Sequence, residues 1–261
     1  MLMSSRAARS REMKLPVLAL VILFTVSSGE PSIGSLIDEI QSRVARVLIG
    51  KKLPPTSGVA TYRHLGSGLL LNIGGTAILL IAWHSIPSTI GADEGLFANF
   101  SPFVPGLHRA SIFYMDPRQD VAVLRVPGLD KHASGLRELD VVAVDEVAAG
   151  EPLVLIGFPD ERARLEATVT YGEAGGVWCA PPPPSRPEPA VSPACPPSYR
   201  RVLTVLGRTV VAGMSGGPAL SRSSGKLVGL NHGFGQSSTS EIGFIADITG
   251  AIAVIRRALE P

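Results

Sequence analysis

The sequence has few cysteines, few aromatic residues and little net charge. Its only cysteines are Cys179 and Cys195, and no cluster of histidine and cysteine lies near them to complete a metal site. The formal net charge is +2, and the arginines are scattered instead of gathered into a stripe. A chain of this kind shows no electrostatic footprint for nucleic acid, so no nucleic-acid partner is predicted.

The composition is that of a folded, turn-rich protein of 261 residues, enough for one sizeable domain or two small ones. Hydrophobic residues make up 45% and charged residues 18%, which excludes disorder for most of the chain. The 28 glycines and 22 prolines favour many turns and short strands. The predicted strands are 44–49, 67–73, 77–83, 109–114, 121–126, 140–144, 152–158, 167–171, 202–206 and 226–231. Their spacing favours an all-β barrel or sandwich over βαβ units.

The first 29 residues have the pattern of an export signal. Basic residues, ending with Lys14, precede an apolar run at 15–24, and small residues such as Ser28 and Gly29 follow. The run is well short of the roughly 20 residues that span a bilayer. We therefore predict a signal peptide at 1–29, with an uncleaved membrane anchor as the alternative. The mature domain at 30–261 is then expected in the periplasm or secreted.

Two helices and one unusual loop complete the predicted layout. Ser35, with Asp38 three residues later, predicts the cap of a short N-terminal helix at 35–42. Asp247 precedes an amphipathic C-terminal segment whose last turn is basic, which predicts a capped helix. Residues 180–197 are rich in proline and read as a surface loop. With export, Cys179 and Cys195 are predicted to form a disulfide closing this loop (179–197). The alternative is two free thiols.

The strongest local signal is the string GMSGGP at 213–218. A serine between glycines permits a sharp turn, exposes its hydroxyl and frees backbone N–H groups to bind an oxyanion. The string also fits the nucleophile elbow of α/β-hydrolases, and a glycine-rich surface turn is the plainest reading. An α/β-hydrolase needs an acid and then a histidine after its serine. Only His232 follows Ser215, and no acidic residue lies between them. The reverse order, histidine then aspartate then serine, is available upstream.

His84 and Asp120 are the upstream candidates. His84 ends the apolar run TAILLIAWH, where an unpartnered imidazole would be costly, and Asp120 stands directly before VAVLRV. A strand starting at Asp120 would carry its carboxylate to the edge of the core, where an imidazole is a suitable partner. We read Asp116 as a turn residue before Pro117. The other histidines, His64, His108, His132 and His232, lie in polar or glycine-rich segments typical of surface or loop positions.

At these three blocks the chain resembles the trypsin-like serine peptidases, and among them it is most similar to the bacterial Deg or high-temperature-requirement proteases. GSGLLL, LIGFP, GKLVGLN and IGFIADI are further blocks of resemblance, which covers roughly residues 40–259 and leaves no room for a PDZ domain. The resemblance implies two six-stranded antiparallel β-barrels, with the short N-terminal helix and the C-terminal helix at their flanks. It also implies a serine endopeptidase that cleaves protein or peptide substrates through an acyl-enzyme.

The resemblance further implies roles for individual residues. Ser215 would be the nucleophile, His84 the base, Asp120 its orienting acid, and the N–H groups of Gly213 and Ser215 the oxyanion hole. No metal or organic cofactor is implied. The residues implied to line the specificity pocket are Thr209, Asn231, His232 and Gly233. Because Thr209 is not acidic, a small or medium apolar residue is expected before the scissile bond.

The chain departs from the family at two positions near the site. Met214 stands where relatives usually carry Asp or Asn, and Trp83 stands before His84 where Ala is usual. Without an acid at Met214, activation by a freed N-terminus is not expected. The alternative function is a catalytically weak or inactive member of the fold that acts as a binding module.

Overall fold

The computed structural model describes residues 32–51, 62–100, 103–160, 166–180, 200–207, 209–236 and 241–259. The chain divides into two units, Met1–Pro31 and Ser32–Pro261. The first unit, with the predicted signal peptide, lies outside the described residues. Within the described part, no helix is both long and apolar enough to cross a membrane.

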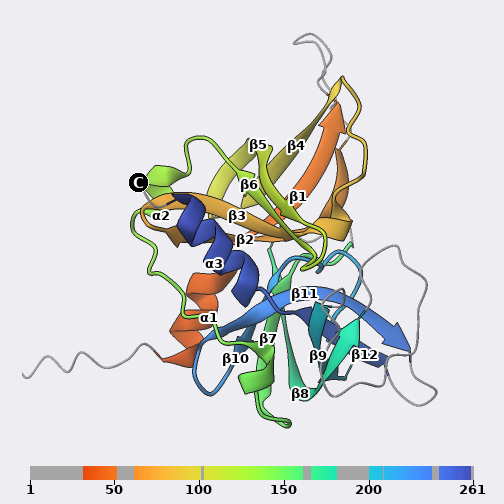
Figure 1. Ribbon diagram of the computed structural model, residues 1–261. Coiled ribbons are helices and arrows are strands. Elements are labelled where there is room, and N and C mark those ends of the chain that lie inside the picture. The colour runs from red at the N-terminus through yellow and green to blue at the C-terminus, as the bar shows by residue number, and fades with distance from the viewer. Residues whose placement is uncertain are drawn as a thin grey trace, which may run out of the picture. The chain divides into compact units, whose positions relative to one another are not determined.

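The described residues form two closed barrels of six antiparallel strands each, as the resemblance implied (Figure 1). In the first barrel the strands neighbour one another in the order β1-β2-β3-β6-β5-β4. Its strands are β1 (Val44–Lys51), β2 (Tyr62–Ile73), β3 (Thr76–Ala82), β4 (Glu94–Phe100), β5 (Val104–Asp116) and β6 (Val121–Arg125). Closure of the sheet pairs every edge strand and leaves an interior that side chains fill.

The second barrel repeats this design with the order β10-β11-β12-β9-β8-β7. Its strands are β7 (Pro152–Gly157), β8 (Thr168–Ala180), β9 (Arg200–Leu206), β10 (Pro218–Ser221), β11 (Leu227–Gln236) and β12 (Glu241–Ala246). The expected strand at 140–144 is wrong: only Val141 forms a bridge, to Leu227, and a 3-10 turn, Val144–Glu146, follows. Val144 is fully buried in the core of the second barrel, so its apolar character reflects packing and not a strand.

Two longer helices pack where the barrels meet, α1 (Ile33–Ser42) and α3 (Thr249–Leu259), and a single turn, α2 (Asp130–Ala133), lies beside the first barrel (Figure 1). The cap predicted at Ser35 is wrong, since α1 begins earlier and Ser32 is its N-cap, accepting the N–H of Ser35. The cap predicted for α3 is confirmed: Asp247 Oδ1 accepts from both the N–H and the hydroxyl of Thr249.

Three apolar clusters hold this architecture together. One fills each barrel, and the third lies between them and includes residues of α1, β2, β7 and α3 such as Ile40, Leu69, Ile156 and Ile252. All four of these side chains are almost completely buried. The cluster between the barrels fixes the two sheets against each other, so loops from both can meet at a defined geometry.

Candidate active site

His84 and Asp120 meet because β3 and β6 are paired. The last pair in the register joins Ala82 to Val121, so the residues just after β3 and just before β6 are neighbours. His84 lies in a 3-10 turn, Trp83–Ser85, one residue beyond the predicted strand end. The backbone closes this corner, with Trp83 N–H donating to the Asp120 carbonyl at 3.0 Å.

Asp120 is held from several directions. Its Oδ1 accepts the His84 backbone N–H at 2.9 Å, and its Oδ2 lies 2.7 Å from His84 Nδ1. Its φ of 56° is in the left-handed region, which aspartate tolerates better than most residues. Burial by itself would raise the pKa of this carboxyl, but hydrogen bonds from His232 and His84 outweigh burial and lower the pKa. Asp120 is therefore a buried carboxylate, as the sequence predicted.

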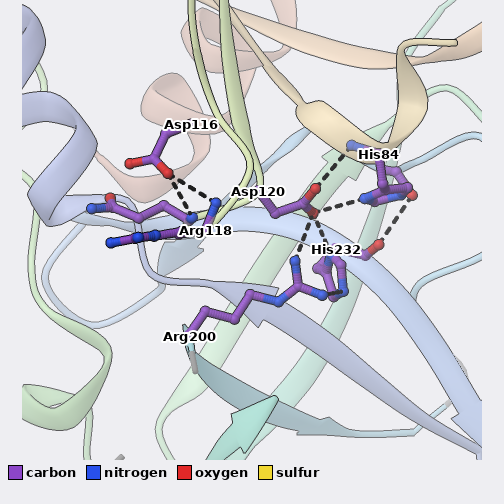
Figure 2. Close-up of polar contacts among 8 residues, drawn as sticks. His84, Asp116, Arg118, Asp120, Arg200 and His232 are labelled. Atoms are coloured by element: carbon purple, nitrogen blue, oxygen red, sulfur yellow. Dashed lines mark hydrogen bonds and ion pairs between the residues drawn. The ribbon is translucent and has the colours of Figure 1, made fainter. Parts of the chain in front are cut away.

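The position of His232 differs from the one that the sequence predicted. We expected a surface or loop histidine with a role in the pocket wall, but it lies in β11 and is largely buried. Its Nδ1 is 2.5 Å from Asp120 Oδ2, the same oxygen that contacts His84. The two imidazole rings meet edge to face with centroids 4.9 Å apart. Figure 2 shows both rings converging on the one carboxylate.

Arg200 completes this cluster from the first position of β9. Its Nη2 lies 2.7 Å from His232 Nε2, and its Nη1 lies 3.6 Å from Asp120 Oδ2 (Figure 2). Its side chain is 7% exposed. The sequence signal for it was weak, because an arginine after a proline-rich segment has no pattern that points to a site 80 residues upstream. The ligand atoms of His84, Asp120 and His232 are close enough to hold a cation, but the neighbouring guanidinium charge opposes one.

The string at 213–218 forms a tight turn between β9 and β10. Gly213 has a φ of +91° and Gly216 a φ of +87°, which disfavours any other residue at either position. A side chain at Gly216 would also come within 2.2 Å of the Ser67 carbonyl. The N–H of Gly216 donates to the Asn231 carbonyl, and the N–H of Asn231 donates to the Gly217 carbonyl. These two hydrogen bonds place Ser215 beside β11.

The Ser215 hydroxyl donates to the carbonyl of His232 at 3.3 Å. No hydrogen bond joins it to His84 in the described part of the chain. Likewise, within the described residues no acceptor contacts the N–H of Gly213 or of Ser215, the predicted oxyanion donors. Gly213 and Ser215 thus leave two backbone donors available beside the half-buried hydroxyl of Ser215.

Ser67 on β2 ties this turn to the first barrel. It is fully buried, its N–H donates to the Ser215 carbonyl at 2.8 Å, and its hydroxyl donates to the Gly213 carbonyl at 2.9 Å. The same hydroxyl accepts the N–H of Phe158 at 2.8 Å. With the Gly213 carbonyl held by Ser67, the Met214 N–H is directed to Val211. The serine of the GSG block therefore sets the orientation of the peptide between Gly213 and Met214.

Met214, the departure noted in the sequence, is fully buried and packs within the core of the second barrel. This apolar side chain holds the turn in place by packing in the core. An acidic side chain at the same position would need a charged or polar partner.

The predicted pocket residues lie in the second barrel. Thr209 is buried and its carbonyl accepts the hydroxyl of Thr170, while the amide of Asn231 donates to the Ile156 carbonyl at 3.1 Å. A side chain added at Gly233 would meet open space. A separate cavity of about 610 Å³ adjoins His84 on the first barrel. Its lining, which includes Trp83, Ile86, Pro87, Ile90, Ile112 and Met115, is largely apolar.

Cys179 lies at the end of β8 and is not a free thiol. Its predicted partner Cys195 and most of the proline-rich loop lie outside the described residues, so the disulfide stays a prediction.

The comparisons with known proteins agree with this arrangement. A family model for the trypsin-like peptidase domain matches residues 66–230, more than half of the chain. No curated protein matches the sequence significantly.

Among solved structures, the HtrA-type protease AlgW with a decapeptide has a TM-score of 0.59 and 19% identity, covering 87% of this chain and 67% of its own. The active form of the Rv3671c protease from M. tuberculosis has a TM-score of 0.56 and 21% identity, covering 95% of this chain and 92% of its own. At these identities the structural likeness supports the two-barrel fold.

Proposed function

Because the chain belongs to the trypsin-like peptidase domain family and is a peptidase hydrolase, we propose that it is a serine endopeptidase with Ser215 as nucleophile. The observation that carries this proposal is that the two histidines differ in what contacts their Nε2 atoms. Both contact Asp120 through Nδ1, but the Nε2 of His232 is taken by Arg200. His84 is therefore the histidine whose Nε2 is free to take a proton.

The proposed reaction follows from these atoms. Ser215 Oγ attacks the carbonyl carbon of the substrate while its proton moves to His84 Nε2. The imidazolium then gives that proton to the leaving amine as the C–N bond breaks, and water hydrolyses the acyl-enzyme by the same steps. Asp120 stabilises the charged imidazole. For the first step the Ser215 hydroxyl turns from the His232 carbonyl toward His84, an adjustment common when a substrate enters a free enzyme.

The free N–H groups of Gly213 and Ser215 would donate hydrogen bonds to the negatively charged oxygen of the tetrahedral intermediate. A donor fixed in advance is worth about 3 kcal/mol of the activation barrier at such a site. The hydrogen bond from Ser67 to the Gly213 carbonyl supports this role, because it keeps that carbonyl from turning into the place of the oxyanion.

The direct test is labelling with a fluorophosphonate probe, which reacts only with an activated serine. We expect the wild-type protein to be labelled at Ser215 and to cleave casein. Ser215→Ala should abolish labelling, and His84→Ala should reduce it by orders of magnitude. The hydrogen bond from Ser215 to the His232 carbonyl favours the alternative of an inactive binding module. A folded wild-type protein that resists the probe and cleaves neither casein nor peptides would support that alternative.

We further propose that the substrates carry apolar side chains near the scissile bond. Thr209 and Asn231 give the predicted pocket no negative charge, and the cavity beside His84 is largely apolar. A peptide library should show selection for apolar residues next to the cleavage site, and dominant cleavage after Lys or Arg would contradict this assignment.

For location, we propose export to the periplasm or the medium after removal of residues 1–29. The basic start and short apolar run support this. N-terminal sequencing of the mature protein should begin near Gly29 or Glu30. Intact Met1 on protein in the membrane fraction would favour the anchored alternative, and intact Met1 on cytoplasmic protein would exclude export.

A further inference from the structure

The carboxylate of Asp120 serves two imidazoles at once. Its Oδ2 contacts His84 Nδ1 at 2.7 Å and His232 Nδ1 at 2.5 Å. An ionised carboxylate can only accept hydrogen bonds, so each Nδ1 must carry its proton for both contacts to be favourable. His232 is thus a second donor that fixes the direction of Oδ2 toward His84.

Arg200 determines which tautomer His232 adopts. A guanidinium has donors and no acceptor and does not lose its charge in proteins. Its Nη2, 2.7 Å from His232 Nε2, can only donate, so Nε2 must be without a proton. The proton of the neutral ring is then on Nδ1, where Asp120 needs it. The reverse tautomer, or the imidazolium, would place two N–H groups against each other.

Within the described part of the chain, the titratable and charged groups that face the His232 ring belong to this cluster. They are Asp120 from the start of β6, Arg200 from β9 and His84 from the turn after β3. Burial lowers the pKa of His232 most, the hydrogen bond and charge of Asp120 oppose this, and the charges of Arg200 and His84 add to the lowering. The ring therefore stays neutral and keeps one defined donor.

Burying the charged guanidinium of Arg200 costs free energy unless the group is paired. Its side chain is 7% exposed, and within the described residues its guanidinium contacts His232 and Asp120. By contrast the next residue, Arg201, is half-exposed and pairs with Asp145 and Asp247, away from the site. Two adjacent arginines of β9 thus have separate environments, which gives a matched control.

We propose that Arg200 is a positioning residue that acts through His232: it holds His232 in the Nδ1–H tautomer, and His232 in turn orients Asp120 for His84. The proposal rests on the peptidase function proposed above. It makes a chain of Arg200, His232, Asp120, His84 and Ser215 in which only the last three touch the reaction.

The tautomer can be measured without any catalysis. In protein with ¹⁵N-labelled histidine at pH 7.5, the nitrogen spectrum of His232 should show a protonated Nδ1 and an unprotonated Nε2. A His232 ring protonated at Nε2 would overturn the proposal even if the enzyme is fully active. Failure of probe labelling at Ser215 with the expected tautomer present would instead overturn the proposed function alone.

Kinetics on a double-mutant cycle tests the direction of action. Arg200→Met should lower kcat about 10- to 100-fold, as loss of a group that orients a catalytic ligand does, with KM changed less than about twofold. His232→Asn places an amide N–H where Nδ1 was and has no ring tautomer, so it is the background in which tautomer control by Arg200 is absent. In that background Arg200→Met should cost no more than about threefold.

An equal loss from Arg200→Met in both backgrounds would mean that the arginine acts on Asp120 by charge alone, and the proposal would fail. Wild-type kcat in Arg200→Met would also refute it. Arg201→Met is the control and should leave kcat and KM unchanged. If circular dichroism shows that Arg200→Met does not fold, Arg200→Lys, which keeps a donor, must show the Nδ1–H tautomer and activity above that of His232→Phe. Failure in either respect would refute the proposal.

Discussion

At the scale of single residues, the site depends on the acceptor capacity of one carboxylate. Asp120 accepts two imidazole N–H groups and one backbone N–H, and a guanidinium lies near the same oxygen. Two imidazole N–H groups and a guanidinium converge on Oδ2, and this arrangement favours the ionised acid. The lowered pKa of Asp120 means that it remains a carboxylate well below neutral pH. A neutral amide at this position would satisfy only part of the network.

We expect Asp120→Asn to lower kcat by roughly four orders of magnitude, the loss typical when the base of a triad is held in the wrong tautomer. The amide of asparagine presents N–H groups to two histidines that are themselves donors. Peptide hydrolysis and the far-ultraviolet circular dichroism of the variant would be measured together.

Asp116→Asn is the matched control for this experiment. Asp116 lies four residues earlier, where its Oδ1 accepts the N–H groups of Arg118 and Gln119 in a turn, as the sequence predicted (Figure 2). Asparagine supports the same turn, so activity should stay near wild type. An Asp120→Asn protein with more than a tenth of wild-type kcat would contradict the assigned role of Asp120.

At the scale of elements, the active site is assembled from strand ends and not from any one segment. The pairing of β3 with β6 joins His84 to Asp120, and the pairing of β10 with β11 sets Ser215 beside His232. Asp120 joins the two barrels through its contact with His232, and Ser67 on β2 joins them a second time through the turn at Ser215. The turn that carries Ser215 is therefore oriented by a residue of the other barrel.

Ser67→Ala should lower kcat about 10-fold or more with little change in KM. The substitution frees the Gly213 carbonyl and leaves the Phe158 N–H without its acceptor, which costs about 1–3 kcal/mol of stability. Steady-state kinetics and urea unfolding would separate the two effects. Ser111→Ala, on an exposed position of β5, is the control and should change neither quantity. If Ser67→Ala lost stability but kept its kcat, Ser67 would be structural only.

At the scale of the whole molecule, stability should depend on pH through histidines that are buried neutral. Burial lowers the pKa of His64, against the opposing effect of its hydrogen bond to the Gly66 carbonyl. Above the ordinary histidine pKa of about 6.5 both folded and unfolded chains hold this ring neutral. Below it the unfolded chain takes up a proton that the folded chain resists, so acid favours unfolding.

We therefore expect the Tm to fall between pH 8 and pH 5, and to fall less in His64→Gln than in the wild type. Glutamine fills similar space and cannot titrate. Differential scanning calorimetry at several pH values would measure both curves. His132→Gln, on the short helix α2, is the control and should follow the wild-type curve. Parallel curves for His64→Gln and the wild type would show that His64 does not contribute to acid lability.

The proline-rich loop gives a second prediction at this scale. Arg200 is the first residue of β9 after this loop, and β9 leads toward the turn that contains Ser215. We expect the loop to control substrate entry. Deleting residues 180–194 and replacing both cysteines should change cleavage of a folded protein and of a short peptide unequally.

The Tm of this deletion variant should drop only modestly, since a disulfide across such a loop contributes about 3 kcal/mol in the chain-entropy model. Replacing the cysteines alone, with the loop kept, is the control that isolates the disulfide. Equal changes for both substrates, or loss of the fold, would mean that the loop does not act as a gate.

The sequence by itself determined the all-β class, most strands, the C-terminal helix and the identity of the triad candidates. These features depend on local periodicity, on glycines at 213 and 216 that only a sharp turn requires, and on the order of three short blocks. The expected strand at 140–144 failed because pairing stops at the single bridge of Val141 to Leu227, and the burial of Val144 in the second barrel comes from packing.

Only the tertiary structure brought His232 and Arg200 to Asp120. They lie 112 and 80 residues away in sequence, and neither stands in a pattern that local propensity can detect. Their meeting depends on the closure of the second barrel, which sets β9 and β11 on either side of β12, and on its packing against the first. Such contacts depend on the register and docking of whole sheets, which local sequence patterns do not encode.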